Sequence, residues 1–321
     1  MHEPITLVGT EQLENSIESR CTVCGQQSWA NLREGRDLRR PNCAKVFKLT
    51  RCRSCGHVMQ NPLPDAGELS RAYAAEYAPY RPAWKEKGRP LWKILRELTT
   101  LRRVRRLKRY ARGSRLLEVG SGAGDFLYAA KRAGWEVAAV EYSKTLADLL
   151  RSELGFDVRS GELTRGTWQP ESFDLVVLWS VLEHVPDPLE TLAIVASYLK
   201  PGGTAFIQLP IVSALQIGKP FGQYWENLDL PRHLNFFDKE CLSRLCGKAG
   251  MKLAVFKTPL LDVGWAYLTS CSNYANCSRS RAQRYIRLAL LTPIIFAVLP
   301  YMAVQAWRGR GTEAFVVAVK N

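Results

Sequence analysis

The stretch "LLEVGSGAGDFLYAA" at residues 116–130 constrains the fold more strongly than any other part of this sequence. A short apolar run ends at Glu118, glycines follow at positions 120, 122 and 124, and a helix-like stretch then begins. Strand, glycine turn and helix in this order are typical of a turn that holds a nucleotide, because glycine lets the backbone approach a ligand closely. The segment therefore predicts the first strand–turn–helix unit of an open α/β sheet.

Apolar runs of strand length alternate with helical patterns along residues 115–210. The expected strands span 115–119, 136–141, 173–180 and 204–210, and the expected helices span 125–134, 143–154 and 187–200. A further helix and two further strands are expected at 238–249, 252–257 and 312–320. This alternation predicts a doubly wound α/β sheet that binds its ligand at the carboxyl ends of the strands.

Acidic side chains around the glycine turn indicate the charge of the ligand. Glu118 and Asp125 flank the turn and disfavour a pyrophosphate, but they suit a ligand with an ammonium or sulfonium group. Glu141 ends the next strand, where an acid accepts hydrogen bonds from the ribose hydroxyls. Glu162 and Leu163 follow the strand "DVRS" and are expected beside an adenine ring. An adenosine with a cationic tail is S-adenosylmethionine, which we therefore predict as the cofactor.

The sequence resembles the class I S-adenosylmethionine-dependent methyltransferases in a series of ordered motifs: "LLEVGSGAGDF", "VAAVEYS", "SFDLVVLWSVLEHVPDP", "LKPGGTAFIQLP" and the terminal "EAFVVAVK". The resemblance extends over roughly residues 95–258 and the last strand. It implies a Rossmann-like α/β sheet of seven strands and a methyltransferase activity. The predicted cofactor site consists of Glu118, Gly120, Ser121, Gly122, Gly124, Asp125, Phe126, Glu141, Tyr142, Glu162, Leu163 and Trp179.

Two Cys-x-x-Cys-Gly sequences near the N-terminus predict a metal site. "CTVCG" provides Cys21 and Cys24, and "CRSCG" provides Cys52 and Cys55. Four thiolates make a closed tetrahedral site, the typical arrangement of structural Zn²⁺. Paired cysteines of this kind favour a reducing compartment over disulfides, and the first residues show no pattern of a secretion signal. We therefore expect a cytoplasmic protein with structural zinc as a second cofactor.

A zinc module before a methyltransferase domain resembles two groups of bacterial enzymes. Sugar methyltransferases, including C-methyltransferases of nucleotide-linked deoxysugars, open with paired Cys-x-x-Cys sequences and continue with a stretch like residues 61–80. In a group of 23S ribosomal RNA guanine methyltransferases, the second ligand pair follows sooner and usually ends in histidine. The wide gap and four cysteines here resemble the sugar group more closely. This resemblance implies a small-molecule or glycan acceptor: a sugar, or a nucleotide- or lipid-linked sugar of envelope or natural-product biosynthesis.

Three alternative functions remain open from the sequence. A net charge of +15 and the basic stretch at 101–115 suit an RNA partner, so the first alternative is a ribosomal RNA base methyltransferase. The second is a quinone- or lipid-type O-methyltransferase. The third is a non-catalytic binding protein on a methyltransferase fold, against which the intact Glu118, Glu141 and glycine turn argue.

Candidate catalytic groups follow the expected fourth strand. In "SVLEHVPDP", Glu183 and His184 are expected to face the sulfonium, with His184 as general base for a hydroxyl or an acidified carbon. The resemblance to sugar C-methyltransferases implies that this pair works at the acceptor. The alternatives are a structural histidine that caps the next helix and a second candidate base, His233.

The segment at 211–238 is too long and too aromatic for a plain connector, and loops of this length in compact domains are usually functional. Tyr224, Trp225, Asp229 and Arg232 are expected to form a wall around the acceptor. In this prediction Arg232 binds a phosphate or a carboxylate of the acceptor. The alternative is a packed cover over the cofactor pocket.

The stretch at 288–306 is apolar and uncharged, with arginines on both flanks. A single membrane crossing is excluded, because the strands before and after it are expected in one sheet. We expect short helices at 260–311, which either lie on a membrane surface through residues 284–310 or form a buried cover or dimer face. The expected domains are a zinc module at 1–62, a helical linker and lid at 63–110, and a methyltransferase domain at 111–321.

Overall fold

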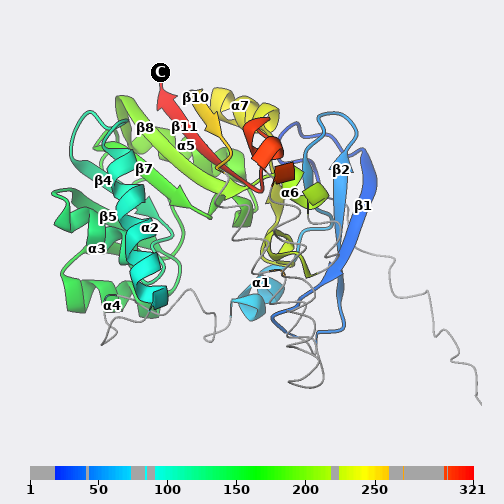
Figure 1. Cartoon of the computed structure of the whole chain (residues 1–321), viewed down its shortest axis with the longest axis horizontal. Helices are drawn as coiled ribbons and strands as arrows, with labels where there is room; N and C mark the ends of the chain where they lie inside the picture. Colours follow the sequence, from blue (N-terminus) through cyan, green and yellow to red (C-terminus); the bar gives the residue numbers. More distant parts are fainter. Residues whose placement is uncertain are drawn as a thin grey trace, which may run out of the picture.

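A computed structural model describes residues 19–40, 43–73, 84, 91–217, 224–259, 270, 300–301 and 303–321. Two β-sheets organise these residues (Figure 1). The larger sheet lies on the left of the view and is flanked by helices, and strands β1 and β2 of the smaller sheet stand on the right. The described part of the chain is thus a large α/β unit with a small antiparallel sheet beside it.

Seven strands form the larger sheet in the order β10-β11-β8-β7-β4-β5-β6. Their bounds are β4 Arg115–Val119, β5 Glu136–Glu141, β6 Asp157–Ser160, β7 Phe173–Trp179, β8 Leu199–Pro210, β10 Met251–Lys257 and β11 Glu313–Lys320. Strands β4 to β8 run parallel, whereas β11 pairs antiparallel with β8 and β10. Because the strand order reverses between β4 and β7, a ligand-binding crevice is expected at their carboxyl ends. The predicted seven-stranded Rossmann-like fold is confirmed.

Helices cover both faces of this sheet. They are α2 Leu91–Leu107, α3 Asp125–Arg132, α4 Lys144–Leu154, α5 Pro188–Tyr198 and α7 Lys239–Lys248. Helices α2, α3 and α4 pack on one face and α5 and α7 on the other. Leu116 and Leu117, neighbours on β4, belong to opposite cores and are both fully buried, as in a parallel sheet covered on two sides. The helix predicted at 187–200 ends at Tyr198, because β8 already begins at Leu199.

The turn between β4 and α3 requires glycine at two positions. Gly120 and Gly124 have φ angles of 71° and 77°, in the left-handed region that side chains disfavour. A Cβ atom at Gly120 would lie 2.8 Å from a methyl carbon of Val181, and one at Gly124 would lie 2.3 Å from a methyl carbon of Leu150. The tight turn therefore depends on the glycines from which its ligand-binding role was predicted.

The smaller sheet joins the N-terminal residues to a late segment of the chain. Its strands follow the order β1-β2-β3-β9 and span Trp29–Arg36, Val46–Cys52, Val58–Gln60 and Asn235–Phe236. Strand β9 lies in the segment at 211–238 that was predicted to form the acceptor wall. The segment near the predicted acceptor site is therefore part of the sheet that follows the first cysteine pair.

Short helices close the space between the two sheets. They are α1 Ala66–Ala72, α6 Val212–Ile217, and the 3-10 helices η3 Leu182–His184 and η5 Glu226–Leu228. Helix α1, at the lower centre of Figure 1, begins with a capping box. The Asp65 carboxylate accepts from the Glu68 amide at 2.7 Å, and the Glu68 carboxylate accepts from the Asp65 amide at 3.2 Å. This cap fixes the start of the helix whose last turn precedes Tyr73.

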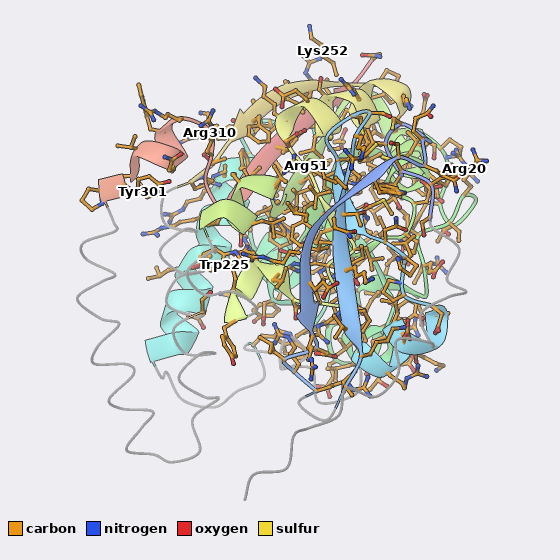
Figure 2. The ribbon with its side chains drawn as sticks, turned by 90° about the vertical axis from the view of Figure 1, so that its right-hand side faces the viewer. Arg20, Arg51, Trp225, Lys252, Tyr301 and Arg310 are labelled. Atoms are coloured by element: carbon orange, nitrogen blue, oxygen red, sulfur yellow. The ribbon has the colours of Figure 1, made fainter. Side chains whose placement is uncertain are left out.

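The apolar stretch predicted at 288–306 falls mostly outside the described residues. In its described part, Tyr301 is 58% exposed, and Trp307 beyond it is 86% exposed. Figure 2 places Tyr301 and Arg310 at the outer edge of the molecule. Within the described ranges, the structure contains no helix with the length and apolar character needed to cross a membrane. Membrane contact through residues 284–310 stays a prediction.

Candidate active site

A cavity of about 910 Å³ opens at the carboxyl ends of β4, β5, β7 and β8. The glycine turn and the ends of β5 and β6 line one side, and η3, α1 and residues 227–233 line the other. The predicted site residues that line it are Gly120, Gly122, Glu141, Tyr142, Glu162, Leu163, Trp179, Glu183, His184, Asp229 and His233. The structure thus brings the predicted cofactor and acceptor ends into one continuous space.

Glu141 ties the glycine turn to the next strand. Its Oε2 accepts a hydrogen bond from the Gly122 amide at 2.7 Å, and its Oε1 accepts from the Ser143 amide at 2.9 Å. Burial raises the pKa of this carboxyl, while the two amides oppose that shift. Each oxygen keeps a further lone pair, so the carboxylate is able to accept hydrogen bonds from ligand hydroxyls at the mouth of the turn.

Glu118 lies beneath the turn rather than on the cavity wall. It is 2% exposed, and its Oε2 has no hydrogen-bond partner. Burial raises the pKa of its carboxyl well above the ordinary value, whereas the charge of Arg103 on α2 acts in the opposite direction. The Arg103 guanidinium stacks over the Trp179 ring, 4.6 Å from its centroid. Glu118 is predicted to belong to the cofactor site because its charge suits a cationic ligand; in the structure its side chain lies among buried groups and does not line the cavity.

Four other predicted cofactor residues do not line the cavity: Ser121, Gly124, Asp125 and Phe126. Asp125, in the first turn of α3, accepts a hydrogen bond from the Trp84 amide at 3.3 Å. Phe126 is buried with its ring 5.2 Å from that of Trp179. Asp125 and Phe126 therefore contact Trp84 and Trp179 at the start of α3.

The tautomer of His184 follows from its neighbours. Its Nδ1 lies 2.9 Å from the carbonyl oxygen of Arg232 and 2.8 Å from the Tyr73 hydroxyl. Because a carbonyl oxygen only accepts, Nδ1 carries the hydrogen in the neutral ring and Nε2 carries the lone pair. Burial and the nearby His233 lower the pKa of His184 to about 3. The ring is therefore neutral at physiological pH.

His233 and Glu183 complete a compact group with His184. His233 Nδ1 lies 2.7 Å from the Asn227 carbonyl oxygen, and the two histidine rings meet edge to face with centroids 4.8 Å apart. Glu183 is fully buried, and Oε1 lies 3.8 Å from His184 Nε2. Among the described residues, its carboxylate oxygens have no hydrogen-bond partner beyond its own backbone amide. Burial raises the pKa of the Glu183 carboxyl well above its ordinary value. One ligand atom from each of the three residues lies within 4.8 Å of the others.

Arg232 does not face the cavity, contrary to our prediction that it binds an acceptor phosphate. Its guanidinium is fully buried and donates to Asp37 at 2.8 Å, to Asp229 at 2.8 Å and to the Ala72 carbonyl at 3.2 Å. Asp229 also accepts from Arg39 at 2.9 Å. The charge of Arg232 is neutralised by the carboxylates of Asp37 and Asp229. This arginine therefore links the N-terminal residues to the segment at 211–238.

Two aromatic residues predicted for the acceptor wall lie elsewhere. Trp225 is 1% exposed and packs with residues of the smaller sheet and α6, and Tyr224 packs against the same cluster. Figure 2 shows Trp225 among the packed side chains of the interior. Of the four predicted wall residues, only Asp229 lines the cavity. The two aromatic side chains fill the core between the segment at 211–238 and the smaller sheet.

Three residues around the cavity were not among the predicted site residues. Tyr73 contacts His184, Glu313 at the start of β11 lines the acceptor side, and Gln60 on β3 donates to the His233 carbonyl at 2.8 Å. All three come from distant parts of the chain, and no local pattern predicts that they meet. The capping-box pattern before α1 is a local signal from which an ordered helix near Tyr73 could have been predicted.

The four predicted cysteine ligands form a cluster. Cys21 Sγ lies 3.5 Å from Cys55 Sγ, Cys24 Sγ lies 3.6 Å from Cys52 Sγ, and all four sulfur atoms lie within 4.8 Å of one another. A tetrahedral zinc with Zn–S bonds of ~2.3 Å requires sulfur atoms about 3.8 Å apart. The arrangement therefore fits zinc. Cys43, which lies between the two pairs in sequence, is outside the cluster.

Comparison with known proteins gives a family match over the larger sheet. The model of a family described as a methyltransferase domain matches residues 91–254. A ubiquinone biosynthesis O-methyltransferase of Xanthomonas campestris pv. campestris (strain B100) is 39% identical over 102 residues, which is 30% of this chain and 42% of that protein. One from Azoarcus sp. (strain BH72) is 30% identical over 154 residues, 44% of this chain and 65% of that protein. The chain thus spans less than half the length of the first of these relatives.

Solved structures resemble the fold at low identity. An S-adenosylmethionine-dependent methyltransferase from Mesorhizobium loti superposes with a TM-score of 0.46 at 17% identity, covering 68% of this chain and 96% of that protein. The family match ends at residue 254, so β11 and the smaller sheet lie outside it, apart from β9.

Proposed function

This chain belongs to the methyltransferase-domain family, and from that premise we propose that it transfers a methyl group from S-adenosylmethionine to a hydroxyl of a small-molecule acceptor. One observation carries the proposal. The Glu141 carboxylate, anchored by the amide of the glycine turn, and the His184–His233 pair line the same cavity at the switch point of the sheet. A nucleoside cofactor and an acceptor are thus expected to meet there.

The proposed reaction needs two reactants held in line. A lone pair of the acceptor oxygen attacks the methyl carbon, the C–S bond breaks with its electron pair on sulfur, and S-adenosylhomocysteine leaves. Positioning supplies most of the rate, and the protein must also take the hydroxyl proton. In a site without a metal ion, Nε2 of His184 is the proposed proton acceptor, because Nδ1 carries the hydrogen. His233 and Glu183 are the adjacent groups.

The charge of the cavity favours an uncharged acceptor. Its described wall carries the acidic residues Glu141, Glu162, Glu183, Asp187, Glu190, Asp229 and Glu313. Arg39 is the one lysine or arginine among the described lining residues, and it is paired with Asp229. A phosphate would meet mainly negative charge there. We therefore propose a neutral hydroxylated acceptor, such as a sugar or the sugar of a lipid-linked glycan precursor, in preference to RNA.

A quinone-type phenol is the second candidate acceptor. The two relatives described above are named ubiquinone biosynthesis O-methyltransferases, and a phenol is likewise a neutral hydroxyl donor. The cavity also has apolar lining from Leu69, Val181, Leu163 and Ile194. Oxygen is the methylated atom in both candidates, so the same test covers them.

We further propose that Cys21, Cys24, Cys52 and Cys55 hold a structural zinc ion. Four thiolates leave no open position, so the ion would support folding and take no part in methyl transfer. We also propose that the protein is cytoplasmic and that it consists of a zinc module at 1–62, a helical linker and lid at 63–110 and a methyltransferase domain at 111–321. Contact with a membrane surface through 284–310 would suit a lipid-linked acceptor.

Transfer of labelled methyl groups tests the proposed reaction. The full chain is incubated with S-adenosylmethionine carrying a radiolabelled methyl group and with fractionated cell extract. We expect label in a sugar, lipid-linked glycan or quinone fraction. Label in RNA alone would contradict the proposed acceptor class, and no binding of S-adenosylmethionine in calorimetry would contradict the activity itself.

Two variants make the test specific. Glu141→Gln should abolish most of the labelling, because a neutral amide no longer accepts the same hydrogen bonds from the turn and the ribose. Asp148→Asn changes an acid on the outer side of α4 and serves as the matched control. Equal loss of labelling in both variants would mean that the cavity at Glu141 is not the cofactor site.

A further inference from the structure

We propose that Glu183, His184 and His233 bind one divalent transition-metal ion at the acceptor end of the cavity. This inference rests on the function proposed above and narrows its acceptor to a molecule with two adjacent oxygen atoms. The site is separate from the cysteine cluster in its ligands and in its position: it lines the cavity, whereas none of the four cysteines does.

Both histidines are held as metal-binding histidines are held. Nδ1 of His184 donates to the carbonyl of Arg232, and Nδ1 of His233 donates to the carbonyl of Asn227. A histidine that binds a metal through one ring nitrogen almost always donates a hydrogen bond from the other to a carbonyl or a carboxylate. The carbonyl contacts leave the lone pair on Nε2 in each neutral ring, which is the atom that a metal requires.

Glu183 is a buried carboxyl that lacks a partner. It is fully buried, and within the described part of the chain neither oxygen has a hydrogen-bond partner beyond its own backbone amide. A buried polar group without a partner is costly, and such a group in a native protein needs an explanation such as an ion. Asp229 and Glu313 face the same region and add negative charge around it. A divalent cation would provide the counter-charge that the described residues do not supply.

The backbone holds the three ligands on two segments that are joined to each other. The Leu234 amide donates to the Glu183 carbonyl at 2.8 Å, and the Asn235 side chain donates to the Val185 carbonyl at 2.8 Å. Ligand atoms around one metal ion, with bonds of 2.0–2.2 Å, lie roughly 3 to 3.5 Å apart. The three ligand atoms lie within 4.8 Å of one another, so metal binding would require them to approach by at most about 1–2 Å, a shift that side-chain rotation can supply.

The donor set identifies the class of ion and of acceptor. Two imidazoles and one carboxylate suit divalent transition metals such as Mn²⁺, Fe²⁺, Co²⁺ or Zn²⁺, and three protein ligands leave coordination positions open. Because the group lines the cavity, the open positions would face the acceptor. A vicinal diol or a catechol would occupy two of them at once. The metal would lower the pKa of the hydroxyl that attacks the methyl group, so that its proton passes to water and His184, now a metal ligand, is no longer the base.

Cobalt binding to the zinc-loaded full chain tests the site directly. Co²⁺ is titrated calorimetrically while the visible and near-ultraviolet spectrum is recorded, because thiolate ligation gives an intense charge-transfer absorption that nitrogen and oxygen ligands lack. We expect one equivalent of Co²⁺ to bind without that absorption. Binding with the thiolate absorption would mean exchange into the cysteine cluster, and either that result or no binding at all would overturn the proposal.

Two variants assign the ligands, and a third serves as the control. Glu183→Gln and His233→Gln should each weaken Co²⁺ binding by at least about 10-fold, because each removes one of three ligands. Glu190→Gln replaces an exposed carboxylate of the same cavity and should leave the affinity unchanged. Unchanged binding of S-adenosylmethionine in each variant shows that it folds. Equal affinities in all three variants would place the ion elsewhere and overturn the proposal.

A chelating probe separates this inference from the proposed function. Catechol should shift the visible spectrum of the bound Co²⁺, whereas phenol, with one oxygen, should not. A protein that binds S-adenosylmethionine and transfers methyl groups, yet takes up no Co²⁺, would lose the metal site and keep the proposed function. A protein that binds Co²⁺ through these residues but does not bind S-adenosylmethionine would keep the metal site and lose the proposed function.

Discussion

Glu118 is a carboxyl group that must lose its proton before it attracts a cationic cofactor. Burial raises its pKa well above the ordinary value, so the neutral form persists to higher pH than in an exposed glutamate. The affinity for S-adenosylmethionine should therefore increase as pH rises through this raised pKa. Glu118→Gln should lower the affinity about 10-fold at alkaline pH, the equivalent of one lost charge-assisted interaction, and should match the native chain at acid pH.

Calorimetric titrations between pH 5 and 9 measure this dependence. Glu141, whose pKa is also raised by burial, keeps part of the slope in the Glu118 variant. Glu136→Gln, at the exposed start of β5, is the control and should follow the native curve. Parallel curves for the native chain and Glu118→Gln would show that Glu118 exerts no charge effect on the cofactor.

Arg232 is a second residue whose role depends on burial. Replacing it with methionine leaves Asp37 and Asp229 buried without their shared cation, which typically costs 3–5 kcal/mol. Arg39→Met removes a half-exposed partner of the same Asp229 and should cost less than about 1 kcal/mol. Urea unfolding of both variants measures the free energy of unfolding. Similar losses in the two variants would contradict the structural role of Arg232.

At the scale of elements, the sequence predicted those parts of the fold that carry a local signal. Strands β4, β5 and β7 are continuous apolar runs, and the glycine turn needs left-handed backbone, so both were identified from the residues alone. Strand β9 has two residues and no periodicity, and it became visible only through its pairing with β3. Its residues belong to a segment that was therefore interpreted as a loop.

The same limit explains the errors at the site. His184 and Glu183 were found because they follow a strand end directly. Arg232 was assigned to the acceptor because an arginine near aromatic residues resembles an anion site, and the sequence does not indicate that Asp37 reaches it from the N-terminal part of the chain. Tyr73 was missed for a similar reason. Contacts between distant segments depend on tertiary packing, which no local pattern encodes.

Strand β9 connects the residues after η3 to the first cysteine pair through Asn235, and this connection can be tested. The Asn235 amide donates to the Val185 carbonyl beside His184, and its oxygen accepts from Thr22 at 3.0 Å within the first cysteine pair. Asn235→Ala should leave the affinity for S-adenosylmethionine within about two-fold but reduce methyl transfer roughly ten-fold, because it loosens the acceptor side alone. Binding calorimetry and transfer of labelled methyl groups measure the two effects.

Asn31→Ala, at an exposed position of β1, is the control for this variant and should change neither quantity. A loss of cofactor affinity in Asn235→Ala as large as the loss of activity would mean that the two ends of the cavity are not independent. The backbone argument for the acceptor end would then fail.

At the scale of the whole molecule, the cysteine cluster contacts more than the smaller sheet beside it. The cluster packs against α7: the Lys248 ammonium donates to the Val23 carbonyl at 2.7 Å, and Cys21 and Cys52 belong to the same core as α5 and α7. The sheet next to it contains β9 and, through Gln60, holds the His233 backbone. Loss of the proposed zinc should therefore disturb the proposed acceptor end of the cavity before the proposed cofactor end, which is built on β4 and β5.

Hydrogen exchange measured by mass spectrometry distinguishes the two ends. After removal of zinc by a chelator, or in Cys52→Ser, amides at 46–60 and 231–236 should lose protection, while those at 115–119 and 136–141 should keep it. Cys43→Ser, a cysteine outside the cluster, should leave both regions protected. Uniform loss across both regions would mean that zinc supports the entire fold. Unchanged protection at 231–236 would mean that this segment is held by the hydrogen bonds of Arg232 to Asp37, Asp229 and Ala72, without a contribution from the cysteine cluster.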